Sequence, residues 1–173
     1  MATKDILSEE IGDGHLSLLI AMLEDNTVQW REASGALSQE EVCWQPHSGW
    51  HSIGAVILHN AEVEAYWLHE VITGELIPAE LSARLLSEEI DQGAGKWPVP
   101  PSQPLSWYYA IQDEVRMKTR QILHELHDPL ALYGKDRKFT LRWLLHHVIT
   151  HEAYHCGQMA LLTLQYNSSQ KGK

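Results

Sequence analysis

Residues 140–158 read TLRWLLHHVITHEAYHCGQ and combine a helical apolar pattern with a cluster of histidines. His151 and His155 lie four residues apart, just over one helical turn, so both imidazoles project from one helix face and can reach a single ion. His147 lies another turn back on the same helix. Each step of four residues rotates the side-chain direction by about 40° around the helix axis. Neutral imidazole is a preferred ligand of zinc, nickel, copper and iron. The stretch therefore predicts a helix that carries a divalent-metal site.

Spacing alone leaves a plainer interpretation open, because single histidines in amphipathic helices are often hydrogen-bonded core residues and surface pairs arise by chance. The two histidines are separated by Glu-Ala-Tyr, so the spacing is not that of a zincin protease. Two ligands rarely hold a divalent metal well. His59 is the best candidate for a third ligand, because it lies in an expected helix on the same face as Val56, Glu62 and Val63. Three histidines would leave a coordination position open, as in a catalytic site.

Helical periodicity dominates the rest of the chain, and no convincing strand alternation is present. A capping box at Ser38 and Glu41 predicts a short helical turn over residues 38–44. Ser52 is a suitable N-cap and Gly74 a suitable stop for the second long helix. The expected long helices cover residues 15–34, 52–72, 106–126 and 141–166.

The connection between the second and third long helices is long. We expect a short helix over residues 78–90, then an irregular Gly- and Pro-rich stretch over 91–101. Residues 167–173 are expected to fray. This pattern predicts an all-α four-helix bundle with a crossover between helices two and three, in one domain of residues 1–173 with an ordered core over 15–166.

Composition narrows the class of partner. A formal net charge of −10 argues against binding nucleic acid. Neither a basic amphipathic stretch nor a membrane span nor a signal peptide is recognisable. Cys43 and Cys156 do not form a spaced pair that implies a disulfide or zinc framework. We therefore expect a cytoplasmic protein that acts on a small molecule and contacts neither nucleic acid nor membrane.

Several further residues are candidates for roles near the metal, although packing or solvent exposure explains each of them as well. His147 is a possible fourth ligand or outer neighbour of the ligands. Glu62 and Glu152 are possible general bases or hydrogen-bond partners of the imidazoles. His124 and His127 suggest no function. The candidates for the wall of a pocket are Trp44, His47, Trp50, His51, Trp67 and Trp97.

Residues 151–158, preceded by 144–148, resemble the C-terminal motif of the DinB/YfiT-like superfamily, and residues 52–67 resemble its second-helix segment. The resemblance extends over residues 15–165 and includes the Trp-Tyr-Tyr opening of the third helix. It implies a four-helix bundle with a divalent metal, usually zinc or nickel, held by His59, His151 and His155.

Two further residues of the motif are informative. Family members often carry Arg where this chain has Cys156, so an anion-binding role is in doubt at that position, and a packed thiol is expected instead of a nucleophile. The resemblance also suggests that Gln158 braces the metal region.

A metal held by three neutral imidazoles keeps its full charge, so it can acidify a bound water or thiol and polarise a carbonyl. That permits metal-dependent hydrolysis, with Glu62 or Glu152 moving protons, or transfer and isomerisation through a low-molecular-weight thiol. The resemblance favours thiol chemistry, because relatives include thiol-dependent transferases and an isomerase. A metal- or ligand-binding stress protein without turnover, and a helical dimer that binds metal adventitiously, remain alternatives. Homodimerisation is expected from the apolar bundle faces.

Overall fold

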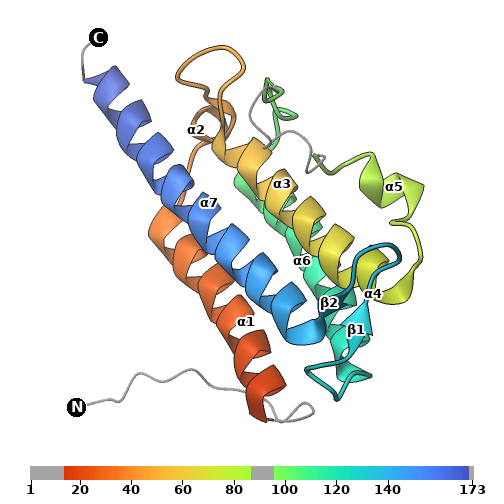
Figure 1. The fold of residues 1–173 in the computed structure, drawn as a ribbon. Coiled ribbons are helices and arrows are strands. Elements are labelled where there is room, and N and C mark those ends of the chain that lie inside the picture. The colour runs from red at the N-terminus through yellow and green to blue at the C-terminus, as the bar shows by residue number, and fades with distance from the viewer. Residues whose placement is uncertain (1–13, 87–95, 172–173) are drawn as a thin grey trace, which may run out of the picture.

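A computed structural model describes residues 14–86 and 96–171 of the chain. Four long helical segments form a bundle, in which the first and last lie side by side and the middle two pack against each other (Figure 1). These segments are α1 (Gly14–Ser34), α3 (Ile53–Ala65) with its continuation η1 (Tyr66–Glu70) and α4 (Val71–Thr73), α6 (Leu105–His124) and α7 (Leu141–Gln170). The third segment follows a long crossover, so the predicted all-α four-helix bundle is confirmed.

The helix ends follow the sequence signals. Ser38 forms the predicted capping box with Glu41 at the start of α2 (Gln39–Cys43). The hydroxyl of Ser52 accepts a hydrogen bond from the backbone of Ala55 and caps α3. Thr140 caps α7 in the same way, and Gly74, with φ of 78°, ends α4.

Three expectations need correction. The helix expected over residues 78–90 is only α5 (Ala79–Ser82) within the described residues, and 87–95 lie outside them. The helix α7 continues to Gln170, past the expected end at 166, and the hydroxyls of Ser168 and Ser169 donate back to its own carbonyls. Two strands form a hairpin where no strand was expected, β1 (Leu132–Tyr133) and β2 (Phe139–Thr140). Strands of two residues are too short to show alternation.

The second long segment also differs from a plain helix. Residues Tyr66–Glu70 form a π-helical turn between α3 and α4, and such turns are often found at functional sites. Periodicity cannot predict a one-residue insertion of this kind. None of the helices in the described parts of the chain combines the length and the apolar character needed to cross a membrane.

The bundle core has two apolar clusters. The lower cluster, at the end of the bundle that carries the hairpin, is built around Leu16, Leu23, Leu68, Leu123 and Leu145. The upper cluster, at the end that carries α2, is built around Trp30, Ala61, Ala65, Ile111 and Val115. Buried polar residues interrupt the apolar pattern of each long helical segment, mostly near the point where the segment passes from one cluster to the other. We call this group the polar layer, and its members are Thr27, Glu64, Gln112, Arg116, Thr119 and Glu152.

Candidate metal centre

Three histidines from two helices converge inside the bundle. His59 lies on α3, and His151 and His155 lie one turn apart on α7. One possible ligand nitrogen of each ring lies within 4.8 Å of the other two. The centroid of the His59 ring is 5.0 Å from those of both other rings, which are 4.4 Å apart. The structure thus brings together the three residues that the sequence singled out.

The donor set fits a divalent metal. Zinc binds imidazole nitrogen at about 2.0–2.1 Å, which places nitrogens around one ion about 3–4 Å apart. The three nitrogens therefore need only small side-chain rotations to share an ion. His59 and His155 are fully buried and His151 is partly exposed, so the cluster has one side nearer to solvent.

Gln158 orients one of the three rings. Its Oε1 lies 2.7 Å from Nδ1 of His155, one turn earlier on α7. A carbonyl oxygen can only accept, so Nδ1 carries the proton and Nε2 carries the lone pair. Such a bond fixes the tautomer and the orientation of a ligand imidazole. Gln158 therefore lies where the resemblance suggested a brace.

The surroundings of His151 favour its neutral form. Burial, with smaller contributions from the neighbouring imidazoles of His155, His59 and His147, lowers the pKa of His151 to about 3. This ring is therefore uncharged near neutral pH. A neutral imidazole is the form that binds a metal.

Trp97 covers the cluster from the crossover. Its ring is buried, and its centroid lies 5.2 Å from that of His59 and 6.2 Å from that of His155. The ring of His51 packs against that of Trp97 with a centroid distance of 4.3 Å. The amide of Gln45 donates to the carbonyl of Trp97 at 3.2 Å, which ties this indole to the loop before α3. Of the predicted pocket residues, Trp97 thus contacts the histidines directly, and His51 packs against Trp97.

The other predicted pocket residues lie farther out. His47 and Trp50 contact each other edge-on at 5.3 Å and are both exposed on the loop before α3. Trp44 packs against Tyr166 near the end of α7. Their contacts put them around the loop and α7, outside the ring of residues that touch the three histidines.

His147 belongs to an aromatic wall on the lower side of the cluster. Its ring is stacked on Trp143 at 5.0 Å with an interplanar angle of 6°, and it meets Trp67 edge-on at 4.9 Å. The centroid of His151 is 6.1 Å away. Burial lowers the pKa of His147, so this ring is also neutral. Phe139 of the hairpin completes the wall by stacking on Trp143.

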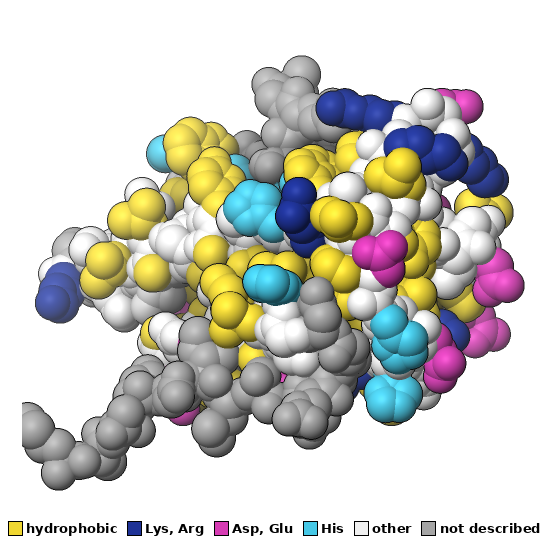
Figure 2. All heavy atoms as spheres, turned by 60° about the horizontal axis from the view of Figure 1, so that its bottom comes forward, with side chains coloured by type: hydrophobic (Ala, Val, Ile, Leu, Met, Phe, Trp, Pro, Cys, Tyr) yellow, Lys and Arg dark blue, Asp and Glu magenta, His cyan; other side chains and the backbone are white. Residues whose placement is uncertain are grey.

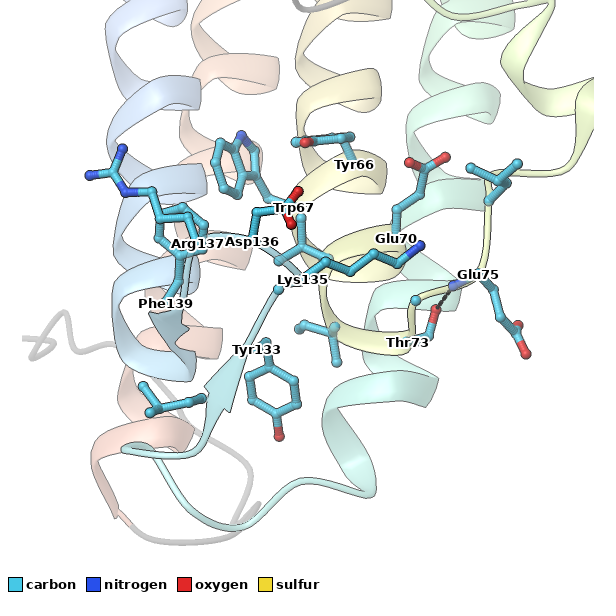
Figure 3. Close-up of a pocket in the computed structure, with 16 residues that line it drawn as sticks. Tyr66, Trp67, Glu70, Thr73, Glu75, Tyr133, Lys135, Asp136, Arg137 and Phe139 are labelled. Atoms are coloured by element: carbon cyan, nitrogen blue, oxygen red, sulfur yellow. Dashed lines mark hydrogen bonds between the residues drawn. The ribbon is translucent and has the colours of Figure 1, made fainter.

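A cavity of about 710 Å³ lies beyond this wall, between the hairpin and the π-helical turn (Figure 3). Tyr66, Trp67 and Glu70 line it from η1, and Lys135 and Asp136 from the hairpin loop, so it mixes aromatic faces with charges of both signs. Figure 2 turns this end of the bundle toward the viewer and shows hydrophobic, cationic and acidic side chains intermingled. Sequence reasoning placed Trp67 in a pocket but did not foresee this hairpin cavity.

The two candidate bases occupy different places. Glu62 lies on α3 three residues after His59 and is partly buried. Glu152 is buried in the polar layer, where its Oε1 accepts hydrogen bonds from Thr27 and from the indole of Trp30, on α1. Burial raises the pKa of Glu152 against the opposing effects of Arg116 and Thr27. This position favours a structural role for Glu152 over proton transfer at the metal.

Cys156 packs against the upper cluster, as expected. Burial, with a smaller effect of Glu152, raises the pKa of its thiol, so it remains protonated. Cys43 and Cys156 are both free thiols. The sequence missed Arg116 and Glu64, which form an ion pair in the polar layer at 2.8 Å. Glu64 shares the second half of α3 with Asn60 and Glu62, so its place in the sequence did not distinguish it from them.

The comparisons with known proteins agree with this arrangement. The family model described as mycothiol-S-transferase matches residues 18–166, which include all three histidines and Gln158. A search of curated proteins finds no match. The match confirms the resemblance to the DinB/YfiT-like superfamily. Because it covers most of the sequence, this chain belongs to the mycothiol-S-transferase family.

Proposed function

We propose that this protein is a metal-dependent transferase that joins a low-molecular-weight thiol to a small electrophile. The observation that carries the proposal is the convergence of His59, His151 and His155 in a chain of the mycothiol-S-transferase family. Mycothiol is accordingly the first thiol to test. Three neutral imidazoles suit zinc or nickel, which are our candidates for the metal.

The bound metal would supply a positive charge that lowers the pKa of a thiol in its open coordination position. The three histidines would hold the ion, and the hydrogen bond to Gln158 leaves Nε2 of His155 with a lone pair available to bind it. Trp97 keeps water from the buried rings of His59 and His155. In the transfer, a sulfur–carbon bond forms, the bond from that carbon to the leaving group breaks, and the leaving group departs with the electron pair. We assign the thiol proton to Glu62, from which it passes to solvent.

Two measurements test the proposal. Elemental analysis of protein purified without a metal-affinity tag should find about one zinc or nickel per chain. Thioether formation from mycothiol and 1-chloro-2,4-dinitrobenzene, followed by absorbance, should then exceed the uncatalysed rate and fall to that rate in His59→Ala. His124→Ala is the matched control, because His124 lies at the end of α6 and should leave the rate unchanged.

The alternatives predict different results. Ester or amide hydrolysis by the metal-loaded chain without any thiol would favour a hydrolase. Stoichiometric metal with neither activity would favour a protein that binds without turnover. If no metal copurifies, and the parent and His59→Ala have the same thermal stability in chelator, the histidines bind metal only adventitiously. That result would refute the metal centre.

A further inference from the structure

A guanidinium and two carboxylates are buried together in the polar layer. The side chains of Arg116 on α6, Glu64 on α3 and Glu152 on α7 are 9%, 2% and 3% exposed. Nε and Nη2 of Arg116 donate to the two oxygens of Glu64 at 2.8 and 2.9 Å. Nη2 also donates to Oε2 of Glu152 at 3.3 Å. One side chain of α6 thus holds both helices that carry the histidines.

The remaining polar atoms of this group are also hydrogen-bonded. Thr119 donates to Oε1 of Glu64 at 2.6 Å. Oε1 of Glu152 accepts from Thr27 at 2.6 Å and from Trp30 at 3.0 Å. The four long helices therefore all contribute to one connected network, which makes the relative position of each helix depend on the others.

The network shares the helices α3 and α7 with the metal centre. Glu152 follows His151 in the chain, and Glu64 comes five residues after His59. A slip of α7 by one residue would move its histidines by about 1.5 Å along the helix axis and by about 100° around it. The same slip would carry Glu152 away from Arg116. The geometry that satisfies the buried charges is therefore also the geometry that gathers the three imidazoles.

Stability alone is a weak explanation for such a network. The desolvation of buried ions offsets much of their attraction, and well-packed apolar replacements are often equally stable. Buried polar groups in helical bundles are better attested as devices that select one register. The two apolar clusters above and below the polar layer would tolerate small slips, whereas the directional bonds of a guanidinium do not.

We propose that Arg116 is a positioning residue for the metal centre. By binding Glu64 on α3 and Glu152 on α7, it fixes the one register and rotation in which the histidines of the two helices share an ion. This inference rests on the proposed metal centre, to which it adds a determinant of metal affinity that touches neither the ion nor a ligand.

The test replaces all three charges together, because removal of one partner would leave a buried charge unpaired. In the triple variant Glu64→Gln/Arg116→Met/Glu152→Gln, side-chain volumes stay similar and the amide oxygens can still accept from Thr119 and Thr27. The probe is cobalt(II), whose affinity is measured by competition with a chelator and whose visible absorption reports coordination geometry. The cobalt affinity and the absorption spectrum are measured at a temperature where circular dichroism shows a fully folded chain.

We expect the triple variant to bind cobalt about 10- to 100-fold more weakly, the usual effect of losing support behind a ligand, with an altered absorption spectrum. The matched control is Arg84→Met/Glu114→Gln, which removes an exposed Arg–Glu pair in which Nη2 of Arg84 lies 2.8 Å from both oxygens of Glu114. The control should keep the affinity and spectrum of the parent. A purely structural network predicts instead a lower melting temperature of the metal-free protein with unchanged cobalt binding.

Unchanged affinity and spectrum in the folded triple variant would overturn the positioning role and leave the metal centre standing. If the triple variant does not fold, Arg116→Lys replaces it, because lysine keeps the charge and loses the planar fork. Cobalt affinity equal to that of the parent in folded Arg116→Lys would then overturn the proposal. A parent chain that binds no cobalt would overturn both the positioning role and the metal centre.

Discussion

Gln158 shows how one side chain can decide which atom of a neighbour is chemically useful. Its carbonyl oxygen accepts the Nδ1 proton of His155 and leaves Nε2 with the lone pair. We predict that Gln158→Leu weakens zinc binding by about 10- to 100-fold, because the ring loses its fixed tautomer and orientation. The measurement is a chelator competition at neutral pH.

The control for this position is Gln158→Glu, which keeps an oxygen acceptor of similar length. A carboxylate behind a ligand imidazole makes the ring a better donor, so this variant should bind zinc at least as tightly as the parent. Equal affinity in Gln158→Leu and the parent would show that the bond to His155 has no part in metal binding.

His69 gives a second prediction for a single residue, this time on stability. Its Nε2 lies 2.9 Å from the hydroxyl of Thr119. Burial lowers the pKa of His69 and Lys118 adds to this, while Glu64 and Glu70 oppose it. Because the folded pKa lies below the unfolded value of about 6.5, the unfolded chain takes up the proton first as pH falls. His69 should therefore reduce the free energy of unfolding below about pH 6.5, by at most about 1.4 kcal/mol per pH unit.

Urea denaturation between pH 5 and 8 checks this sign. In His69→Gln the free energy of unfolding should depend less on pH below about 6.5, since the amide does not titrate. Identical pH profiles for His69→Gln and the parent would contradict the prediction.

At the scale of helices, two glycines give opposite expectations for the same substitution. A Cβ on Gly54 of α3 would lie 2.7 Å from Cζ of Tyr108 on α6. A Cβ on Gly157 of α7 would have no atom within 4 Å apart from its adjoining residues and the backbone of its own helix. Gly54→Ala should therefore lower the free energy of unfolding by about 1–3 kcal/mol through overpacking, despite the higher helix propensity of alanine. Gly157→Ala should raise it by about 0.5–1 kcal/mol.

Urea denaturation of the two variants checks both signs in one experiment. Since each introduces a single methyl group into a helix, each is the control of the other. A gain in stability in Gly54→Ala would mean that α3 and α6 are not held as closely as the structure shows.

The helices were largely predictable because their signals are local. Ser38 and Ser52 cap helices where the sequence predicted, and Gly74 ends one. The π-helical turn, the two-residue strands and the cavity between them depend on tertiary contacts, which carry no periodic pattern. The hairpin, for example, depends on Gly134 with φ of 99°, where a Cβ would meet the carbonyl of Arg137.

The candidate site was predictable to a similar degree. A histidine pair one turn apart is a sequence signal, and a third histidine on another apolar helix could be paired with it through the bundle topology. Which side chain faces which neighbour was not predictable in the same way. Residues 151 and 152 are adjacent, yet His151 joins the other imidazoles and Glu152 joins the polar layer, because successive helical residues differ by about 100°.

For the whole molecule, the metal centre would act as a cross-link between two helices far apart in the sequence. His59 holds the ion from α3, and His151 and His155 hold it from α7. Because a preformed site of this kind is absent from an unfolded chain, bound metal stabilises the folded state by mass action. At free metal 100 times the dissociation constant, the gain is about 2.7 kcal/mol.

We therefore predict that zinc raises the melting temperature of the parent and that the rise disappears in His59→Ala, which leaves the cross-link without its ligand on α3. Differential scanning calorimetry with and without zinc gives the rise in melting temperature for each variant separately. A loss of packing in His59→Ala lowers both of its melting temperatures and therefore cancels in the difference. His124→Ala should keep the full increment of the parent. A zinc-dependent rise of equal size in His59→Ala would mean that α7 binds the ion alone, and the metal would then not join the two halves of the bundle.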